Sequence, residues 1–329
     1  TNPMEPRGGI GAFDPDSRRY TLTVSAQSLH TARDHIAVSL GVAPSDVRVV
    51  ADDVGGGFGV KLWLYPEHVL VLWAAQRLGR PVKWLGSRAE SFLTDRHGRD
   101  VLTKGEMALN QEGRILALRI DNIANLGAYT SYFAPYIPTA GGTRVLPGGY
   151  QIEAIHMRVR GAFTNSAPVD AYRGAGRPEA IYVIERLIDR AARELDLDAA
   201  ELRRLNFVSP AVMPFVTASG ETYDSGDFER LLDDALVMAD RPGFEARRAE
   251  ARVRGAWRGL GICFYVESTV GEGDERADIR FTEDGTVELL VGTQSTGQGH
   301  ETAYAQLLGG QLGIPMTRIR IVQGDTARI

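Results

Sequence analysis

A glycine-rich loop with one aromatic ring follows a strand-like segment early in the chain. Its residues, Gly55–Lys61, include four glycines within five positions, and Phe58 is the one large side chain among those five. Each glycine costs conformational entropy on folding and brings no side chain to a core. The backbone N–H groups of the loop are therefore expected to face a bulky ligand. The loop is not a phosphate-binding P-loop, because Val60 precedes Lys61 and Leu62 stands where that motif has a hydroxyl.

Two further loops have the same design, a glycine-rich backbone beside the start of a helix, with fixed polar side chains. One is Ala171–Arg177, which carries Arg173 and Arg177, and the other is Gly292–Thr302. Amide groups at a helix N-terminus favour negative charge, and arginine adds further donors. One such loop is weak evidence, but three in one chain predict a large anionic cofactor.

These loops need regular elements to position them, and the sequence predicts a mixed α+β protein in which helices pack on sheets. Alternating or short apolar segments predict strands at Tyr20–Ser25, Val47–Val54, Val82–Leu85, Gly105–Asn110, Ile115–Ala124, Gly261–Val266, Ala277–Phe281 and Val287–Val291. Apolar residues spaced three to four apart predict helices at Ser28–Leu40, Pro66–Leu78, Pro178–Leu195, Phe228–Met238, Pro242–Val253 and from the third loop through Leu308.

The amino-acid composition of the chain changes near residues 240–258. This change predicts two regions, 1–240 and 241–329.

In the helix predicted at Pro66–Leu78, the core-facing side is expected to consist of Val69, Leu70, Trp73, Ala74 and Leu78.

The chain has 329 residues, a net charge of −5 and no basic stripe interleaved with aromatics, so nucleic acid is not an expected partner. Its one cysteine, Cys263, excludes an internal disulfide framework and is expected to be a small buried hydrophobe. The histidines show no ligand spacing on one helical face, so no protein-bound metal is predicted. These 329 residues contain no signal-peptide pattern and no apolar run that could span a bilayer, and we expect a cytoplasmic location.

In order along the chain, three motifs together resemble the molybdenum-binding subunit of the xanthine dehydrogenase / aldehyde oxidoreductase / carbon monoxide dehydrogenase family. They are Gly-Gly-Gly-Phe-Gly-x-Lys at 55–61, Ala-Tyr-Arg-Gly-Ala-Gly-Arg-Pro-Glu at 171–179, and Gly-Thr-Gln-Ser-Thr-Gly-Gln-Gly-His-Glu-Thr at 292–302. The segments 3–7 and 323–326 also fit. The resemblance implies the molybdopterin-binding fold of the aldehyde oxidase / xanthine dehydrogenase type, with 1–240 as a first cofactor-binding region and 241–329 as the incomplete start of a second.

The resemblance also implies a set of site residues. Gln27 matches a glutamine that hydrogen-bonds an oxygen ligand of molybdenum, and Phe58 and Gly59 match the loop whose backbone lies over the metal. Arg173 matches an arginine beside the metal, so these four residues are the candidates for a catalytic role. The residues that match cofactor-binding positions are Gly56, Gly57, Phe58, Gly59, Arg173, Gln298 and Gly299.

Substrate positions show departures from the better-known members. Carbon monoxide dehydrogenases have a copper-binding cysteine where Gly174 stands, and xanthine-oxidising members have phenylalanine at Ala175 and glutamate at Leu62. Neither carbon monoxide nor a purine is therefore an expected substrate. The resemblance instead implies oxidation of an aldehyde or an N-heteroaromatic carbon with oxygen from water. Phe264 matches an aromatic that packs on ring substrates, although as a single residue it fits a core position equally well.

The cofactor implied is molybdenum-molybdopterin in its cytosine dinucleotide form, with iron–sulfur and FAD subunits as partners in a dimeric complex. The chain starts without methionine, and we expect it to be an internal fragment whose base glutamate lies beyond Ile329. Alone it is expected to be inactive and without cofactor. The alternative is a non-catalytic cofactor-binding or assembly module. A parent reading frame that continues into a Gly-Glu segment would distinguish the two.

Overall fold

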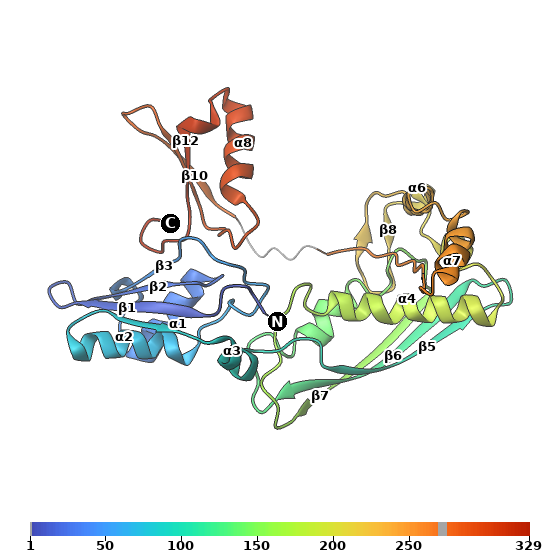
Figure 1. Cartoon of the computed structure of the whole chain (residues 1–329), viewed down its shortest axis with the longest axis horizontal. Coiled ribbons are helices and arrows are strands. Elements are labelled where there is room, and N and C mark those ends of the chain that lie inside the picture. Colours follow the sequence, from blue (N-terminus) through green and yellow to red (C-terminus); the bar gives the residue numbers. More distant parts are fainter. Residues whose placement is uncertain (1, 269–274) are drawn as a thin grey trace. The chain divides into compact units, whose positions relative to one another are not determined.

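The computed structural model describes residues 2–268 and 275–329 (Figure 1). Its contacts divide the chain into two compact units. Unit 1 contains Thr1–His97, Ala171–Arg173 and Gly271–Ile329, and unit 2 contains Gly98–Asp170 and Gly174–Val270. Both units combine sheets with helices, so the predicted mixed α+β class is confirmed. The boundary at residue 240 stays a prediction.

The first sheet of unit 1 has the strand order β3–β2–β1–β4. Its strands are β1 (Gly8–Asp14), β2 (Arg19–Val24), β3 (Val47–Val50) and β4 (Val82–Leu85), and the helices with it are α1 (Leu29–Leu40), α2 (Pro66–Leu78) and the short α3 (Arg88–Thr94). β1 is antiparallel to β2 and β4, whereas β2 and β3 are parallel. Parallel neighbours need a crossover, which α1 supplies between them. Leu22, Ile36, Val49 and Leu72 are buried where the helices meet the sheet.

The buried side of α2 differs from the predicted one. The structure buries His68, Val71, Leu72 and Ala75, whereas Leu70, Trp73 and Leu78 are 57%, 48% and 59% exposed. Contact with β1 decides between the two sides, because a Cβ at Gly11 would lie 2.5 Å from the carbonyl carbon of Val71. The helix approaches the strand at this glycine, so the residues around position 71 face the core.

A second, smaller sheet of unit 1 lies near the end of the chain. Its strands are β10 (Ala277–Phe281), β11 (Val287–Val291) and β12 (Ile319–Val322), with helix α8 (His300–Leu312) before the last of them. β10 and β11 are antiparallel, and β11 and β12 are parallel. An isolated bridge pairs Val50 with Asp325, so residues just after β12 contact the end of β3.

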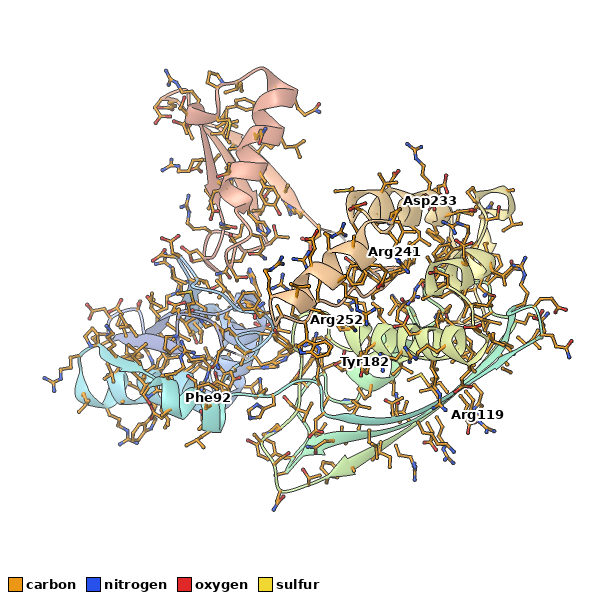
Figure 2. All side chains as sticks on the ribbon, turned by 45° about the vertical axis from the view of Figure 1, so that its right-hand side comes forward. Phe92, Arg119, Tyr182, Asp233, Arg241 and Arg252 are labelled. Atoms are coloured by element: carbon orange, nitrogen blue, oxygen red, sulfur yellow. The ribbon has the colours of Figure 1, made fainter. Side chains whose placement is uncertain are left out.

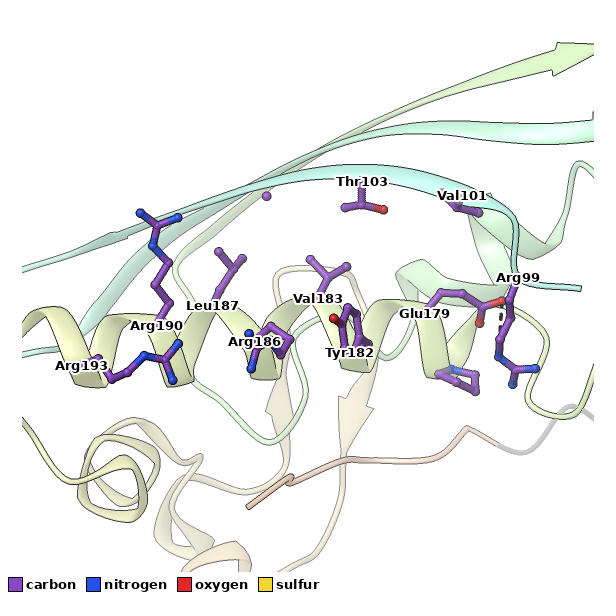
Figure 3. Close-up of a pocket in the computed structure, with 12 residues that line it drawn as sticks. Arg99, Val101, Thr103, Glu179, Tyr182, Val183, Arg186, Leu187, Arg190 and Arg193 are labelled. Atoms are coloured by element: carbon purple, nitrogen blue, oxygen red, sulfur yellow. Dashed lines mark ion pairs between the residues drawn. The ribbon is translucent and has the colours of Figure 1, made fainter. Parts of the chain in front are cut away.

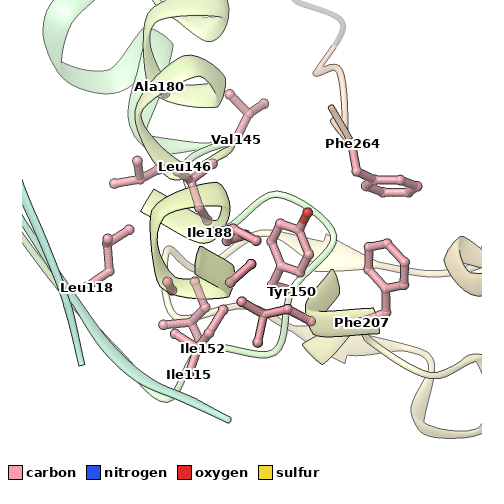
Figure 4. Packing of buried hydrophobic residues seen from close by; sticks show 14 of the residues in the cluster. Ile115, Leu118, Val145, Leu146, Tyr150, Ile152, Ala180, Ile188, Phe207 and Phe264 are labelled. Atoms are coloured by element: carbon pink, nitrogen blue, oxygen red, sulfur yellow. The ribbon is translucent and has the colours of Figure 1, made fainter. Parts of the chain in front are cut away.

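Unit 2 is built on a three-stranded sheet in the order β5–β6–β7, with the long helix α4 lying along one face (Figure 1). Its larger elements are β5 (Val101–Leu109), β6 (Ile115–Gly127), β7 (Ala154–Phe163), α4 (Arg177–Glu194), α5 (Ala199–Asn206), α6 (Phe228–Met238) and α7 (Phe244–Val253), and its smallest strands are β8 (Phe215–Val216) and β9 (Thr222–Tyr223). Leu118 of β6 packs in one buried cluster with Ile188 of α4 (Figure 4). Arg119 projects from the other face of the sheet (Figure 2).

The segment Gly261–Val266, predicted to be a strand, has no strand conformation in the structure. A buried ion pair holds it instead: Phe264 N–H donates to Glu185 Oε2 at 2.8 Å, and Arg203 Nη2 donates to the Ile262 carbonyl at 3.0 Å. Arg203 also bonds Glu185 at 2.7 Å. The prediction of a buried Cys263 is wrong, because the thiol is exposed. With its two neighbours anchored toward the core, an extended backbone directs Cys263 the other way.

His68 gives unit 1 a pH-dependent stability. Burial and the Arg7 guanidinium lower the pKa of His68 from 6.5 to about 4, while Glu67 acts in the opposite direction. Between these values the unfolded chain binds a proton that the folded chain does not, so stability falls as the pH drops from 6.5 toward 4. We expect unfolding in urea to show a loss of about 1 kcal/mol from this group between pH 7.5 and 5.5.

The variant His68→Gln should lose this part of the slope, since glutamine does not titrate. The control His156→Gln alters an exposed position on β7 and should retain it. A His68→Gln protein with the same pH dependence as the parent would contradict the assignment.

Candidate functional site

One carboxylate oxygen anchors the glycine loop of unit 1. Glu5 Oε2 accepts hydrogen bonds from Gly55 N–H at 2.6 Å, from Ser25 Oγ at 2.5 Å and from Lys61 Nζ at 2.9 Å. Lys61 Nζ also donates to Ser25 Oγ at 2.7 Å, and its side chain is 1% exposed. Lys61 is thus an internal cation that holds the loop, which agrees with its exclusion as a phosphate-binding lysine.

The pKa values of this pair reflect both burial and pairing. Burial would raise the pKa of Glu5, but the hydrogen bonds from Ser25, Lys61 and Gly55 outweigh it, and the pKa is lowered. Burial lowers the pKa of Lys61 more than Glu5 raises it. The carboxylate is therefore stabilised in its charged form, and its contribution to stability is lost as the pH falls through its lowered pKa.

The loop itself has an unusual backbone. Gly56, Phe58 and Gly59 have φ values of 93°, 55° and 97°, a region that is costly for a residue with a Cβ such as Phe58. The loop is also closely packed, since a Cβ at Gly57 would lie 2.2 Å from Gln27 Cδ. Only glycine fits there, so the loop places Phe58 in one defined position.

Gln27 is tied to the loop by both its backbone and its side chain. Its N–H donates to the Lys61 carbonyl at 2.9 Å, and its Oε1 accepts from Gly59 N–H at 2.9 Å. The Nε2 group of the Gln27 amide is therefore the donor that remains available to a ligand. Phe58 N–H has no acceptor in the part of the chain that the structure describes. The site thus offers a ligand two hydrogen-bond donors, Gln27 Nε2 and Phe58 N–H, whereas Gly59 N–H already donates to Gln27.

The second loop joins the first through Arg173. Its N–H donates to the Phe58 carbonyl at 3.1 Å, and its guanidinium carbon lies 5.6 Å from the centre of the Phe58 ring, a cation–π distance. A Cβ at Gly59 would lie 2.4 Å from the Ala171 carbonyl oxygen, so the two loops are in contact. The structure therefore brings together Gln27, Phe58, Gly59 and Arg173.

The third loop is linked to the same unit through Gln323. Ser295 N–H donates to Gln323 Oε1 at 3.0 Å, and the next residue, Gly324, accepts from Ala51 N–H at 2.8 Å. Arg48 of β3 pairs with Asp325 at 2.6 Å. These contacts attach the third loop to the end of β3, and four residues separate β3 from the glycine loop.

Polar groups of the third loop remain open for a ligand. Both side-chain polar atoms of Gln294 are shielded from solvent without a partner among the described residues. Gln298 Oε1 accepts from Thr296 Oγ1 at 3.1 Å, within its own loop. Gly299 precedes α8 with a φ of 75°, and the first turn of this helix has no side-chain cap. Its amide groups are therefore open to a polar or anionic group.

Of the three predicted substrate residues, Leu62 belongs to unit 1 with this cluster, whereas Ala175 and Phe264 belong to unit 2. Leu62 is half-buried and its N–H donates to the Gly59 carbonyl at 3.2 Å. Ala175, with a φ of 39°, belongs to unit 2. Phe264 also belongs to unit 2, where it is 6% exposed and its ring centre lies 4.6 Å from that of Phe207 (Figure 4). Their substrate roles stay predictions.

Sequence reasoning did not single out Glu5, Ser25 or Gln294. Glu5 lies within the segment 3–7 and Gln294 within the motif at 292–302, and both segments fitted the family pattern. Ser25 had no such signal, and the partners of all three residues depend on folding.

The α+β fold and these loops define a class of protein in which backbone and amide groups hold a large cofactor. A family model of the molybdopterin cofactor-binding domain matches residues 1–207, and a second with the same description matches residues 235–329. The chain belongs to this family, and the resemblance inferred from its motifs is confirmed.

Several named proteins are similar to this chain. The chain is 36% identical to the carbon monoxide dehydrogenase large chain of Hydrogenophaga pseudoflava, over 99% of this chain and 42% of the relative. It is 33% identical to the nicotine 6-hydroxylase large subunit of Paenarthrobacter nicotinovorans, over 99% and 41%. The crystal structure of quinoline 2-oxidoreductase from Pseudomonas putida 86 matches with a TM-score of 0.92 at 33% identity, over 98% of this chain and 43% of that one. The chain spans about two-fifths of the length of the curated relatives that it matches.

The residues present fit molybdopterin. Close contacts of Gly57 with Gln27 and of Gly59 with Ala171 hold the donors of the glycine loop in place, and the unpartnered amide of Gln294 suits a ligand rich in hydrogen-bonding groups. Within residues 2–268 and 275–329, no three side chains of His, Cys, Asp or Glu gather to hold a metal ion. None of the described helices is long and apolar enough to cross a membrane.

Replacement of Lys61 tests whether the anchor stabilises the loop. We expect Lys61→Met to lower the free energy of unfolding by about 2 kcal/mol, because Glu5 loses a charged hydrogen-bond donor. The double variant Glu5→Gln/Lys61→Met should recover part of the loss, since no carboxylate is left without its cation. Urea unfolding measures both, with Lys83→Met at an exposed position of β4 as the control. A Lys61→Met protein within about 0.5 kcal/mol of the parent would exclude this role.

Proposed function

We propose that the chain forms the cofactor-binding part of a molybdenum hydroxylase, an oxidoreductase that oxidises an N-heteroaromatic or aldehyde carbon with oxygen from water. The observation that carries the proposal is that two other segments of the chain bond to the backbone of Phe58 and Gly59. Gln27 and Arg173 come from distant segments, and both hydrogen-bond to this two-residue backbone. An arrangement that uses strained backbone and close glycines to present donors favours a catalytic site over a simple binding surface.

In this proposal the hydrogen-bond donors of the site stabilise negative charge that changes during the reaction. Gln27 Nε2 and Phe58 N–H would donate to oxygen atoms at the reacting centre, and Gly59 N–H would orient the Gln27 amide by holding its Oε1. Fixed donors of this kind stabilise charge as it develops, without reorganisation. Arg173 would add a positive charge next to the Phe58 ring and so keep both residues in place.

Molybdopterin, when bound, supplies the metal that accepts two electrons from the substrate. Gln294, Gln298 and the open first turn of α8 would hold its polar groups, and a cytosine dinucleotide form would add a phosphate for this helix end. The electrons would then pass to iron–sulfur and FAD subunits of a dimeric complex. These partners and the dinucleotide form are part of the proposal.

Substrate choice rests on three positions. Gly174 has no thiol to hold copper, and Ala175 and Leu62 offer neither the ring nor the carboxylate that a purine site needs. Two of the similar proteins are named for oxidation of nitrogen-containing aromatic rings, nicotine and quinoline. Relatives of both kinds are similar to this chain, so the absence of a thiol at Gly174, and not overall identity, favours an N-heteroaromatic substrate over carbon monoxide.

The reaction can be tested directly on the purified protein with its native partner subunits and a dye as electron acceptor. We expect quinoline, a pyridine or benzaldehyde to be oxidised, with ¹⁸O from labelled water in the product by mass spectrometry. Xanthine and carbon monoxide should give no turnover. A protein that contains molybdenum but oxidises only carbon monoxide or xanthine would refute the substrate class.

Gln27 provides the sharper test of the site. The variant Gln27→Glu keeps an acceptor for Gly59 N–H but replaces the Nε2 donor with an oxygen, so we expect kcat to fall about 100-fold. Molybdenum content by elemental analysis should be unchanged. Gln76→Glu, at an exposed position of α2, should retain full activity. A Gln27→Glu protein with normal kcat would show that the amide is not a donor in the reaction.

A further inference from the structure

Unit 2 contains a groove that none of the proposed cofactor residues lines. It has a volume of about 650 Å³ and lies between α4 and β5 (Figure 3). Val101 and Thr103 face it from the strand, and Val183 and Leu187 from the helix. The floor is therefore largely apolar. A Cβ at Gly105 would lie 3.0 Å from Leu187, so the helix and strand are in close contact at the bottom of the groove.

One end of this groove is strongly basic. Arg186, Arg190 and Arg193 line it from α4, and all three are exposed. Their spacing of four and three residues places them on one side of the helix. Arg190 pairs with Glu194 at 2.7 Å, but no carboxylate among the described residues lies within 4 Å of Arg186 or Arg193. This is a concentrated positive charge on a chain whose net charge is −5.

The strand beside the groove has an open edge. β5 is the outermost strand of the order β5–β6–β7 and pairs only with β6 among the described residues. On its other side, alternate N–H and C=O groups have no strand partner in the described part of the chain. Such an edge readily accepts an additional extended strand. The apolar floor of the groove, its basic end and the open edge of β5 are adjacent features of one surface.

We propose that this groove binds an extended acidic segment of a partner polypeptide, which adds to the edge of β5 and directs carboxylates at Arg186, Arg190 and Arg193. In a segment that pairs with β5, every second side chain faces α4. Carboxylates at one end of this face pair with the arginines, and apolar side chains further along the same face pack on Val183 and Leu187. The groove follows α4 from Pro178 to Arg193, about 22 Å at the helical rise, which accommodates about seven extended residues. A compact anion would leave the apolar floor and the strand edge unused.

This inference does not depend on the proposed reaction, and a binding measurement tests it. The probe is a fluorescein-labelled octapeptide in which every second residue is serine and the other four are two valines followed by two glutamates. It is titrated with the purified native protein and followed by fluorescence anisotropy. We expect saturable binding that weakens as salt rises, because the arginine contacts are screened. The matched peptide with lysine in place of both glutamates should bind at least tenfold more weakly. N-methylation of every second residue should also weaken binding tenfold in one of its two frames if the peptide pairs with β5.

The variant Arg186→Gln/Arg190→Gln/Arg193→Gln should weaken binding of the acidic peptide at least tenfold. The control Arg230→Gln/Arg252→Gln/Arg254→Gln removes three exposed arginines elsewhere in unit 2 (Arg252 is labelled in Figure 2) and should change it less than twofold. Thermal unfolding followed by circular dichroism verifies that both variants fold. Absence of binding, equal binding of the two peptides, or equal loss in both variants would overturn the proposal. Displacement by tripolyphosphate at an equal affinity would also overturn it, since that identifies a small-anion site.

Discussion

A single carboxylate oxygen, Oε2 of Glu5, holds the segments on which the candidate site of unit 1 depends. It receives the N–H at the start of the glycine loop and the Lys61 ammonium two residues after Gly59, so both ends of the loop are fixed by one atom. Because the loop is closed in this way, the positive φ of Phe58 can be retained. Gln27 and Arg173 then bond to a backbone that is already in position.

Unit 2 uses a similar device for a different segment. The buried Glu185–Arg203 pair hydrogen-bonds to the backbone at Ile262 and Phe264, just as the Glu5–Lys61 pair holds the glycine loop. Burial of such pairs contributes little net stability, since desolvation offsets most of the attraction. Their value is geometric: each pair requires specific partners, and these fix an irregular segment that neither a sheet nor a helix holds.

Local signals predicted a large part of the fold. The bounds of α2, α6, β4, β10 and β11 agree with the structure. Proline and glycine end these elements, or a strict apolar spacing runs through them, and both signals act within a few residues. β1 was missed because three of its seven residues are glycine, which is depleted in strands. β7 was missed because its stability comes from pairing with the distant strand β6. The buried side of α2 was wrong for the same reason, since Gly11 of another strand decides it.

The sequence by itself determined the kind of site: three glycine-rich loops with Gln27, Phe58 and Arg173 identified the cofactor family, because the spacing of glycines and donors is written along the chain. Only the tertiary structure decided which hydrogen-bond donors remain available to a ligand. Gly59 N–H is used by Gln27, Lys61 is buried against Glu5, and Phe264 packs in the core of unit 2. Hydrogen bonds and burial join residues that are far apart in sequence, so they are determined by folding and not by local pattern.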